Sequence, residues 1–275
     1  MELPQKNISL FTEYLNILEV SIKEPSLIAL RELIESHLIN IPFENISKLY
    51  NKKKYALYDI PNFEQYIDGI KKYKFGGTCY SNNYYFNKLL EYLGYNVILC
   101  GADMKNPDVH IVSIVKPENQ EFIIDVGYAA PFFEPLPRNI SSNYQISFGK
   151  DKYILFPQDS SGFSQLNFYR NDSLKHSYVV KPHPKSISDF TNVIKDSFSQ
   201  TSTFMNSILL VIFKKNYFKA IHNFTLIEYS NNNYTKREIS NKSKLAQEIE
   251  TEFGMPSEIA YEALAQIINF IDAWN

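Results

Sequence analysis

Residues 75–94 read FGGTCYSNNYYFNKLLEYLG, and this stretch decides how the first half of the chain is organised. Two glycines lead into Thr78, a residue type that favours the N-cap of a helix, and Cys79 follows directly. Apolar side chains then recur at the spacing of one helix face: Phe86, Leu89, Leu90 and Leu93. Gly94 can take the left-handed conformation that ends a helix. The stretch therefore predicts a helix from Thr78 to Gly94 with a cysteine in its first turn.

The residues before this stretch are also predicted to be helical. Apolar side chains recur at helical spacing over residues 8–37, and a break near residues 23–25 divides them into two helices. Pro42 disfavours a helical conformation at Ile41, so the second helix ends there. A third helix is predicted over residues 63–72.

After Gly94 the apolar period changes from that of a helix to the period of two that is typical of strands. The predicted strands are residues 97–99, 109–115, 122–126, 144–148 and 153–156. Beyond Pro182 helices and strands are mixed. The elements predicted there are a helix at 186–195, strands at 207–213 and 218–229, and helices at 242–253 and 256–273. This order predicts an α+β protein with three lobes, divided near residues 94 and 185.

Composition narrows the class of protein. The 275 residues are 44% hydrophobic and 21% charged, as in ordinary globular chains, and the formal net charge is -2. We expect no nucleic-acid partner, because the lysine runs are short and scattered. We expect no membrane partner and a cytoplasmic location, because the amino terminus lacks the pattern of a secretion signal and no apolar run is long enough to span a bilayer. Two cysteines cannot form a four-thiol zinc site, and no metal is expected.

Cys79 is a candidate nucleophile because of where it lies in the predicted helix. The first turn of a helix has unpaired N–H groups and the positive end of the peptide dipoles, and both favour a thiolate. The same N–H groups can hold the oxyanion of a tetrahedral intermediate. A cysteine in a helix is more often a small buried hydrophobic residue, so this signal needs partners.

His110 and Asp125 supply those partners. Each interrupts an otherwise apolar strand, and a buried carboxylate is costly unless it is paired with a group such as an imidazole. Either residue alone is more often explained by ordinary structure. Together with Cys79 they match a nucleophile, a base and an orienting acid in the order Cys, His, Asp.

The turn between the two strands leaves two registers open. A two-residue turn at 117–118 would place His110 directly opposite Asp125, whereas a four-residue turn at 117–120 would place Asp125 opposite Val112. Both registers keep the two polar side chains on one face, with about 5 Å or about 7–8 Å between their Cβ atoms. A turn with an odd number of residues would put them on opposite faces.

These motifs resemble those of the arylamine N-acetyltransferase family. The family pattern around the nucleophile is Arg-Gly-Gly-X-Cys-aromatic-Glu-X-Asn, and residues 75–83 read FGGTCYSNN. The likeness continues in IPFEN at 41–45, in His110 and in DVGY at 125–128, and it covers roughly residues 10–137. The resemblance implies an N-terminal helical bundle over 1–94, a central β-barrel over 95–185 and a C-terminal α/β lid over 186–275. The Cys-His-Asp arrangement would be that of cysteine proteases.

The resemblance also implies an activity and a co-substrate. Cys79 would take the acetyl group of acetyl-CoA and pass it to an arylamine, arylhydrazine or N-hydroxyarylamine in a ping-pong reaction. Phe43, Tyr128 and Phe204 would line the slot for the aromatic acceptor, and Gly127 would contact the CoA. Propionyl-CoA and malonyl-CoA remain open as donors.

Three residues depart from the family pattern. Phe75 replaces the arginine before the glycine pair, Ser81 replaces the glutamate after the cysteine, and Ala129 replaces a glycine. Two other functions stay open. One is a Cys-His-Asp hydrolase, in which water resolves the acyl-enzyme. The other is a non-catalytic relative that binds an aromatic ligand or a protein partner.

Overall fold

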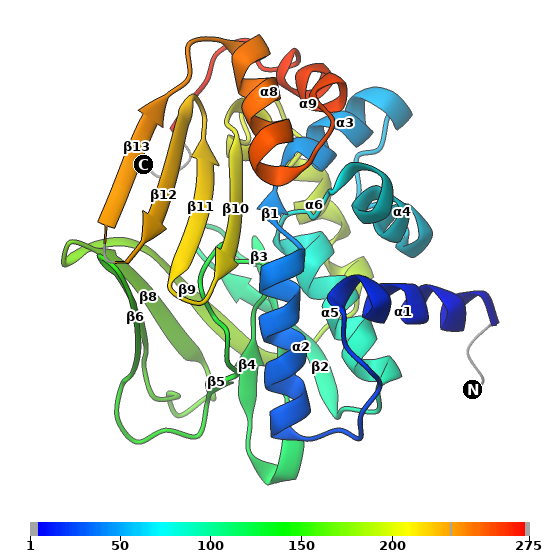
Figure 1. Ribbon diagram of the computed structural model, residues 1–275. Coiled ribbons are helices and arrows are strands. Elements are labelled where there is room, and N and C mark those ends of the chain that lie inside the picture. Colours follow the sequence, from blue (N-terminus) through cyan, green and yellow to red (C-terminus); the bar gives the residue numbers. More distant parts are fainter. Residues whose placement is uncertain (1–4, 232, 273–275) are drawn as a thin grey trace.

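The computed structural model describes residues 5–231 and 233–272 (Figure 1). Residues 1–4, on which the expectation about a secretion signal partly rests, lie outside this range. So does Ala273, the last residue of the final predicted helix. Five helices form the first part of the fold: α1 Gln5–Leu18, α2 Leu27–Asn40, α3 Ile46–Tyr55, α4 Phe63–Tyr73 and α5 Cys79–Tyr92.

The second part is an eight-stranded antiparallel sheet that curls into a nearly closed barrel. Its strands are β2 Val97–Asp103, β3 His110–Val115, β4 Phe122–Ile124, β5 Leu136–Pro137, β6 Tyr144–Phe148, β7 Asp151–Leu155, β8 Ser164–Arg170 and β9 Ser173–Pro184. Their order across the sheet is β5-β4-β3-β2-β9-β8-β7-β6. Helix α5 packs against β2 and β3, so the start of this helix lies beside the barrel.

A five-stranded sheet and two helices complete the fold (Figure 1). The sheet has the order β1-β10-β11-β12-β13, with β1 Phe43–Glu44, β10 Leu209–Lys214, β11 Tyr217–His222, β12 Thr225–Ser230 and β13 Asn233–Glu238. The helices that follow it are α8 Lys242–Phe253 and α9 Ser257–Leu264. Shorter segments before the sheet are η2 Ile187–Phe190, α6 Thr191–Asp196 and α7 Thr203–Asn206.

The short strand β1 joins the early helices to the late sheet. Phe43 pairs with Val211 of β10 and also forms a bridge with Gly77, two residues before Cys79. The loop that carries the cysteine is therefore attached to a strand more than a hundred residues further along the chain. No helix among the described residues is long and apolar enough to cross a membrane.

The predicted fold class is confirmed, and Thr78 and Gly94 flank α5 as expected. Thr78 is the N-cap residue, and Gly94 follows the helix with a φ of +88°. The divisions at residues 94 and 185 stay a prediction. Strand β1 lies before residue 94 in the sequence but belongs to the late sheet.

Several predicted elements were wrong or missing. The strand predicted at 218–229 is a hairpin, because Asn223 adopts a left-handed conformation and turns the chain between β11 and β12. Helix α9 ends at Leu264, nine residues before the predicted end. The chain beyond it is bonded at Ile271, whose N–H donates to the carbonyl oxygen of Asn206 and whose carbonyl oxygen accepts from Asn223 Nδ2. Helix α3 and strands β8 and β9 were not predicted.

Candidate active site

The glycine pair Gly76–Gly77 allows residues 41–45 to pack closely against the loop that leads to Cys79. A Cβ atom at Gly76 would come within 1.8 Å of the Pro42 carbonyl oxygen, so the two backbones could not approach this closely with any other residue. Glu44 contacts the loop at two points: its N–H donates to Gly77 O at 3.0 Å, and its Oε1 accepts from Gly76 N at 3.1 Å. Burial raises the pKa of this carboxyl. The two sequence motifs therefore lie in contact.

Cys79 is the first residue of α5 and is partly buried. Its Sγ lies 4.0 Å from the carbonyl oxygen of Val109, the residue before His110. The Thr78 side chain makes no capping hydrogen bond, so the N–H groups of the first turn remain available to a ligand. The position is that of a nucleophile with oxyanion donors beside it.

His110 and Asp125 meet as a buried pair. Ser113 pairs with Ile124 in the β3–β4 ladder, and this register corresponds to the four-residue alternative for the turn. His110 begins β3, and Asp125 follows the last residue of β4. The His110 Nε2 donates to Asp125 Oδ2 at 2.7 Å, and the two residues are 1% and 3% exposed.

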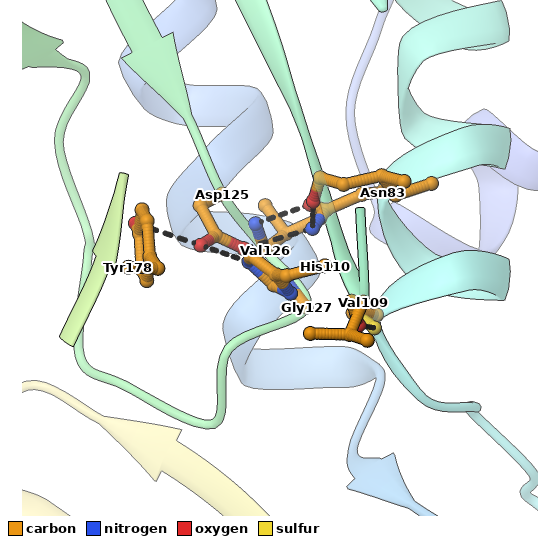
Figure 2. A network of polar contacts seen from close by, with 9 residues as sticks. Asn83, Val109, His110, Asp125, Val126, Gly127 and Tyr178 are labelled. Carbon is orange, nitrogen blue, oxygen red and sulfur yellow. Dashed lines mark hydrogen bonds and ion pairs between the residues drawn. The ribbon is translucent and has the colours of Figure 1, made fainter. Parts of the chain in front are cut away.

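Asp125 accepts hydrogen bonds from three further groups, which Figure 2 shows converging on its carboxylate. Tyr178 Oη donates to Oδ2 at 3.0 Å, and Asn83 Nδ2 donates to Oδ1 at 2.8 Å. The N–H of Gly127 donates to Oδ1 at 3.1 Å. Four donors fix the carboxylate in one orientation.

This arrangement sets the protonation state of His110. Burial alone would lower the pKa of the imidazole, but the Asp125 carboxylate and the hydrogen bond to Cys79 outweigh burial and raise the pKa to about 10. Because Asp125 engages Nε2, the other ring nitrogen, Nδ1, is left to face the thiol. The imidazole is therefore protonated near neutral pH, which favours a thiolate–imidazolium pair.

The cysteine and histidine open into a cavity of about 260 Å³. Phe43, Tyr128, Phe204 and Gly127, which were predicted to bind substrates, all line it. Phe43 and Phe204 are 161 positions apart in the sequence, and their ring centroids lie 5.7 Å apart. The structure thus brings these residues together, while their roles in binding stay predictions. Among the described residues, no group of three or more His, Cys, Asp or Glu side chains is placed to hold a metal.

Asn83 ends the family pattern at residues 75–83 but was given no role from the sequence, and Tyr178 was not predicted at all. Asn83 ties three elements together: besides its bond to Asp125, its Nδ2 donates to Ile111 O at 2.7 Å, and its Oδ1 accepts from Val126 N at 2.8 Å. Its place one helical turn after Cys79 was a usable signal, since it lies on the same helix face. Tyr178 had no such signal, because β9 was not recognised as a strand.

The departures from the family pattern are accommodated by packing. Phe75 is buried against the rings of Tyr50 and Tyr73, with centroid separations of 5.8 and 5.2 Å. Ser81 is buried below the glycine loop, where a Cβ at Gly77 would lie 2.8 Å from the Ser81 Cβ. Both replacements place an uncharged side chain at a buried position. Ala129, in a left-handed conformation, lines the cavity.

Comparison with known proteins agrees with this site. A family model described as N-acetyltransferase matches residues 26–260. The chain belongs to the arylamine N-acetyltransferase family. The arylamine N-acetyltransferase pineal gland isozyme NAT-10 of Gallus gallus is 22% identical over 242 residues, which cover 77% of this chain and 80% of that protein.

Two other relatives show how far the likeness extends. Proansamycin X synthase of Amycolatopsis mediterranei is 24% identical over 162 residues, and the match spans 56% of this chain and 60% of the synthase. The structure of Mycobacterium marinum arylamine N-acetyltransferase in complex with CoA superimposes with a TM-score of 0.77 at 19% identity. That match covers 93% of this chain and 97% of the mycobacterial chain, so the two chains share a fold over nearly all of both lengths.

Proposed function

We propose that this arylamine N-acetyltransferase moves an acetyl group from acetyl-CoA to an arylamine, arylhydrazine or N-hydroxyarylamine through an acetyl-Cys79 intermediate. The observation that carries the proposal is the buried His110–Asp125 pair beside Cys79 at the mouth of an aromatic cavity. Family membership supports the same activity.

In the first half of the reaction the Cys79 thiolate attacks the carbonyl carbon of the acetyl thioester. The carbon–sulfur bond to CoA breaks, and the His110 imidazolium gives its proton to the departing CoA thiolate. The N–H groups of the first turn of α5 hold the oxyanion that forms in between. The products are acetyl-Cys79, neutral His110 and CoA.

In the second half the acceptor nitrogen attacks the acetyl carbon on Cys79. The bond to Sγ breaks, and His110 takes the proton that the nitrogen loses, so the thiolate–imidazolium pair is restored. Asp125 keeps its charge throughout and holds the imidazole in place. The proposal also includes a cytoplasmic location, a compartment in which thiols are kept reduced.

Intact-protein mass spectrometry tests the intermediate. After brief exposure to acetyl-CoA without acceptor, wild type should gain one acetyl group, and Cys79→Ala should gain none. Adding an arylamine or hydrazine should remove the group and yield the acetylated acceptor.

The other outcomes distinguish the alternatives. Loss of the acetyl group at the same rate with and without acceptor would identify a hydrolase instead. If neither an adduct nor free CoA appears while the cavity still binds aromatic amines, the chain is a non-catalytic relative.

A further inference from the structure

Asn82 lies three residues after Cys79 in α5, and its side chain is fully buried. Its Nδ2 donates to the carbonyl oxygen of Gly77 at 3.1 Å and to that of Pro42 at 3.4 Å. This one amide group therefore joins the helix of the nucleophile, the glycine loop before it and the segment 41–45. Position 82 is unspecified in the family pattern over residues 75–83, so family membership assigns it no role.

Tyr66 of α4 fixes the orientation of the Asn82 amide. The two carbonyl oxygens can only accept, so Nδ2 must face Gly77 and Pro42, and Oδ1 must face the opposite way. Tyr66 Oη donates to that Oδ1 at 3.1 Å. The Tyr66 side chain is itself held in place, since it is buried and its ring stacks on Tyr85 with 4.6 Å between centroids. The Asn82 amide cannot turn over without losing these hydrogen bonds.

Asn82 bonds to both amide groups that precede Cys79. Its side chain binds the carbonyl oxygen of the Gly77–Thr78 amide, and its main-chain N–H donates to Thr78 O at 3.1 Å. A trans amide directs its N–H away from its carbonyl group, and the described residues contain no cis peptide bond. The N–H groups of Thr78 and Cys79 are therefore directed away from Asn82, towards the amino-terminal end of α5.

The Gly77–Thr78 amide depends on such support because it follows two glycines. Glycine restricts the rotation of the neighbouring amide groups less than any other residue does. The carbonyl oxygen of Gly77 accepts from the N–H of Glu44 at 3.0 Å as well as from Asn82 Nδ2, and these two hydrogen bonds use its two lone pairs. Without the Asn82 side chain one of the two bonds is lost, and the amide gains freedom to turn.

We infer that Asn82 is a positioning residue for the oxyanion donors at Cys79, and that Tyr66 acts through Asn82. This inference rests on the proposed function and deepens its first step, in which the N–H groups of the first turn of α5 hold the oxyanion. Such donors lower the barrier only when they already point to the place where the charge develops. Within the described part of the chain, the cavity lining does not include Asn82 or Tyr66, so both act through the loop and not on the substrate.

Two reactions of the same thiol test this role. With 4-nitrophenyl acetate the Cys79 thiolate attacks the ester carbonyl, an oxyanion forms, and 4-nitrophenolate leaves. With iodoacetamide the thiolate displaces iodide from a saturated carbon, and no oxyanion forms. The readout is the ratio of the two second-order rate constants, acylation over alkylation, measured by release of 4-nitrophenolate and by intact-protein mass spectrometry.

Asn82→Ala should lower this ratio by about 100-fold, the effect of a displacement of about 1 Å in a catalytic group. The rate of alkylation itself should stay within threefold of wild type. Tyr66→Phe should lower the ratio by about tenfold, because the amide keeps its own donors and loses only the hydrogen bond that orients it.

Asn87→Ala and Tyr85→Phe are the matched controls. Asn87 is a fully buried asparagine of the same helix, and its Nδ2 donates to Ser113 Oγ at 3.0 Å. Tyr85 carries the ring that stacks on Tyr66, and its hydroxyl donates to Pro61 O. Each variant removes a hydrogen bond made by a buried side chain of α5 that is not bonded to the glycine loop. The ratio should therefore stay within threefold of wild type in both.

An unchanged ratio in Asn82→Ala would overturn the inference. So would an equal fall in acylation and alkylation, because a disturbed fold or thiolate, and not misdirected donors, would then explain the loss. Tyr66→Phe keeps the ring and its packing, so it decides the matter if Asn82→Ala does not fold. An unchanged ratio in Tyr66→Phe would then overturn the inference.

The use of an ester separates this inference from the proposed function. If the ester acylates Cys79 of wild type but acetyl-CoA does not, the proposed function fails, and the ratio still decides the role of Asn82. If acetyl-CoA acylates Cys79 and the ratio is unchanged in the Asn82 and Tyr66 variants, only the inference fails. If neither donor acylates Cys79, both fail.

Discussion

Asp125 is the residue on which the polar contacts of the site converge. It was predicted from its place in an apolar strand, but its four donors come from α5, β3, β9 and its own loop. A carboxylate held in this way has one task in the proposed mechanism, which is to keep the imidazole oriented and charged.

Removing the charge of Asp125 tests that task. We expect Asp125→Asn to lower kcat by about 10³- to 10⁴-fold, because the amide cannot accept from all four donors and selects the wrong tautomer of His110. Tyr178→Phe, which removes one donor, should cost about tenfold. Steady-state kinetics would measure both changes.

Tyr95→Phe is the control for the tyrosine variant. It removes a comparable hydrogen bond from a buried tyrosine, to Ser26 O at 3.1 Å, at a place remote from the site. An equal fall in kcat for Tyr95→Phe and Tyr178→Phe would show that general destabilisation, and not the orientation of Asp125, explains the loss.

The protonation of His110 predicts how stability depends on pH. Its pKa rises from an ordinary value near 6.5 to about 10 on folding. A raised pKa contributes stability that is fully present below pH 6.5, declines above it and is lost as the pH rises through about 10. The difference in free energy of unfolding between wild type and His110→Gln should therefore be largest at pH 6 and should narrow towards pH 10. Urea denaturation at pH 6, 8 and 10 measures it, and a constant difference would contradict the raised pKa.

At the scale of elements, the site depends on how closely α5 approaches the loop after β4. Gly127 lies at that contact: a Cβ there would lie 2.7 Å from Cys79 Cα and 2.8 Å from Asn83 Nδ2. The helix that carries the nucleophile and the strand that leads to Asp125 can meet only because this residue has no side chain.

Gly127→Ala should therefore push α5 away from the Asp125 loop. We expect kcat/KM to fall by about 100-fold, since a displacement of about 1 Å in a catalytic group has that effect. Gly69→Ala is the control, because Gly69 lies in α4 and its nearest contact would be the Phe75 ring at 3.2 Å. That variant should keep its activity. Full activity in Gly127→Ala would show that the contact is more tolerant than the geometry implies.

At the scale of the whole molecule, Asn45 links the early helices to the chain that leads into the late sheet. Asn45 Nδ2 donates to Phe204 O at 2.9 Å and to Ser207 O at 2.7 Å, and its Oδ1 accepts from Leu209 N at 3.0 Å. These bonds place Phe204 against Phe43, so they also shape one wall of the cavity.

Asn45→Ala should remove a hydrogen-bond partner from three backbone groups, two of them, Ser207 O and Leu209 N, in buried contacts. We expect a loss of about 3 kcal/mol or more in the free energy of unfolding, together with a higher KM for the acceptor. Asn241→Ala is the control, since Asn241 caps α8 on the surface through one bond to Lys244 N and should cost about 1 kcal/mol. Urea denaturation compares them, and equal losses would contradict a joining role for Asn45.

The local sequence determined the elements with strong periodicity and the residues with distinctive chemistry. Helix α5 with its flanking Thr78 and Gly94 could be predicted because a helix is made by contacts between residues close in sequence. Cys79, His110 and Asp125 could be proposed because each is an unusual residue type for its setting. The motifs at 41–45 and 125–128 were visible for the same reason.

Tertiary structure alone decided the rest. The register of β3 and β4 followed from pairing that the turn sequence left open, and the contacts of Asn83, Tyr178 and Asn45 join positions far apart in the chain. The ion pair of Asp151 and Arg170 reads in sequence as two ordinary surface charges. It becomes part of the cavity only because β7 and β8 pair and curl around it, and long-range pairing leaves no local period in the sequence.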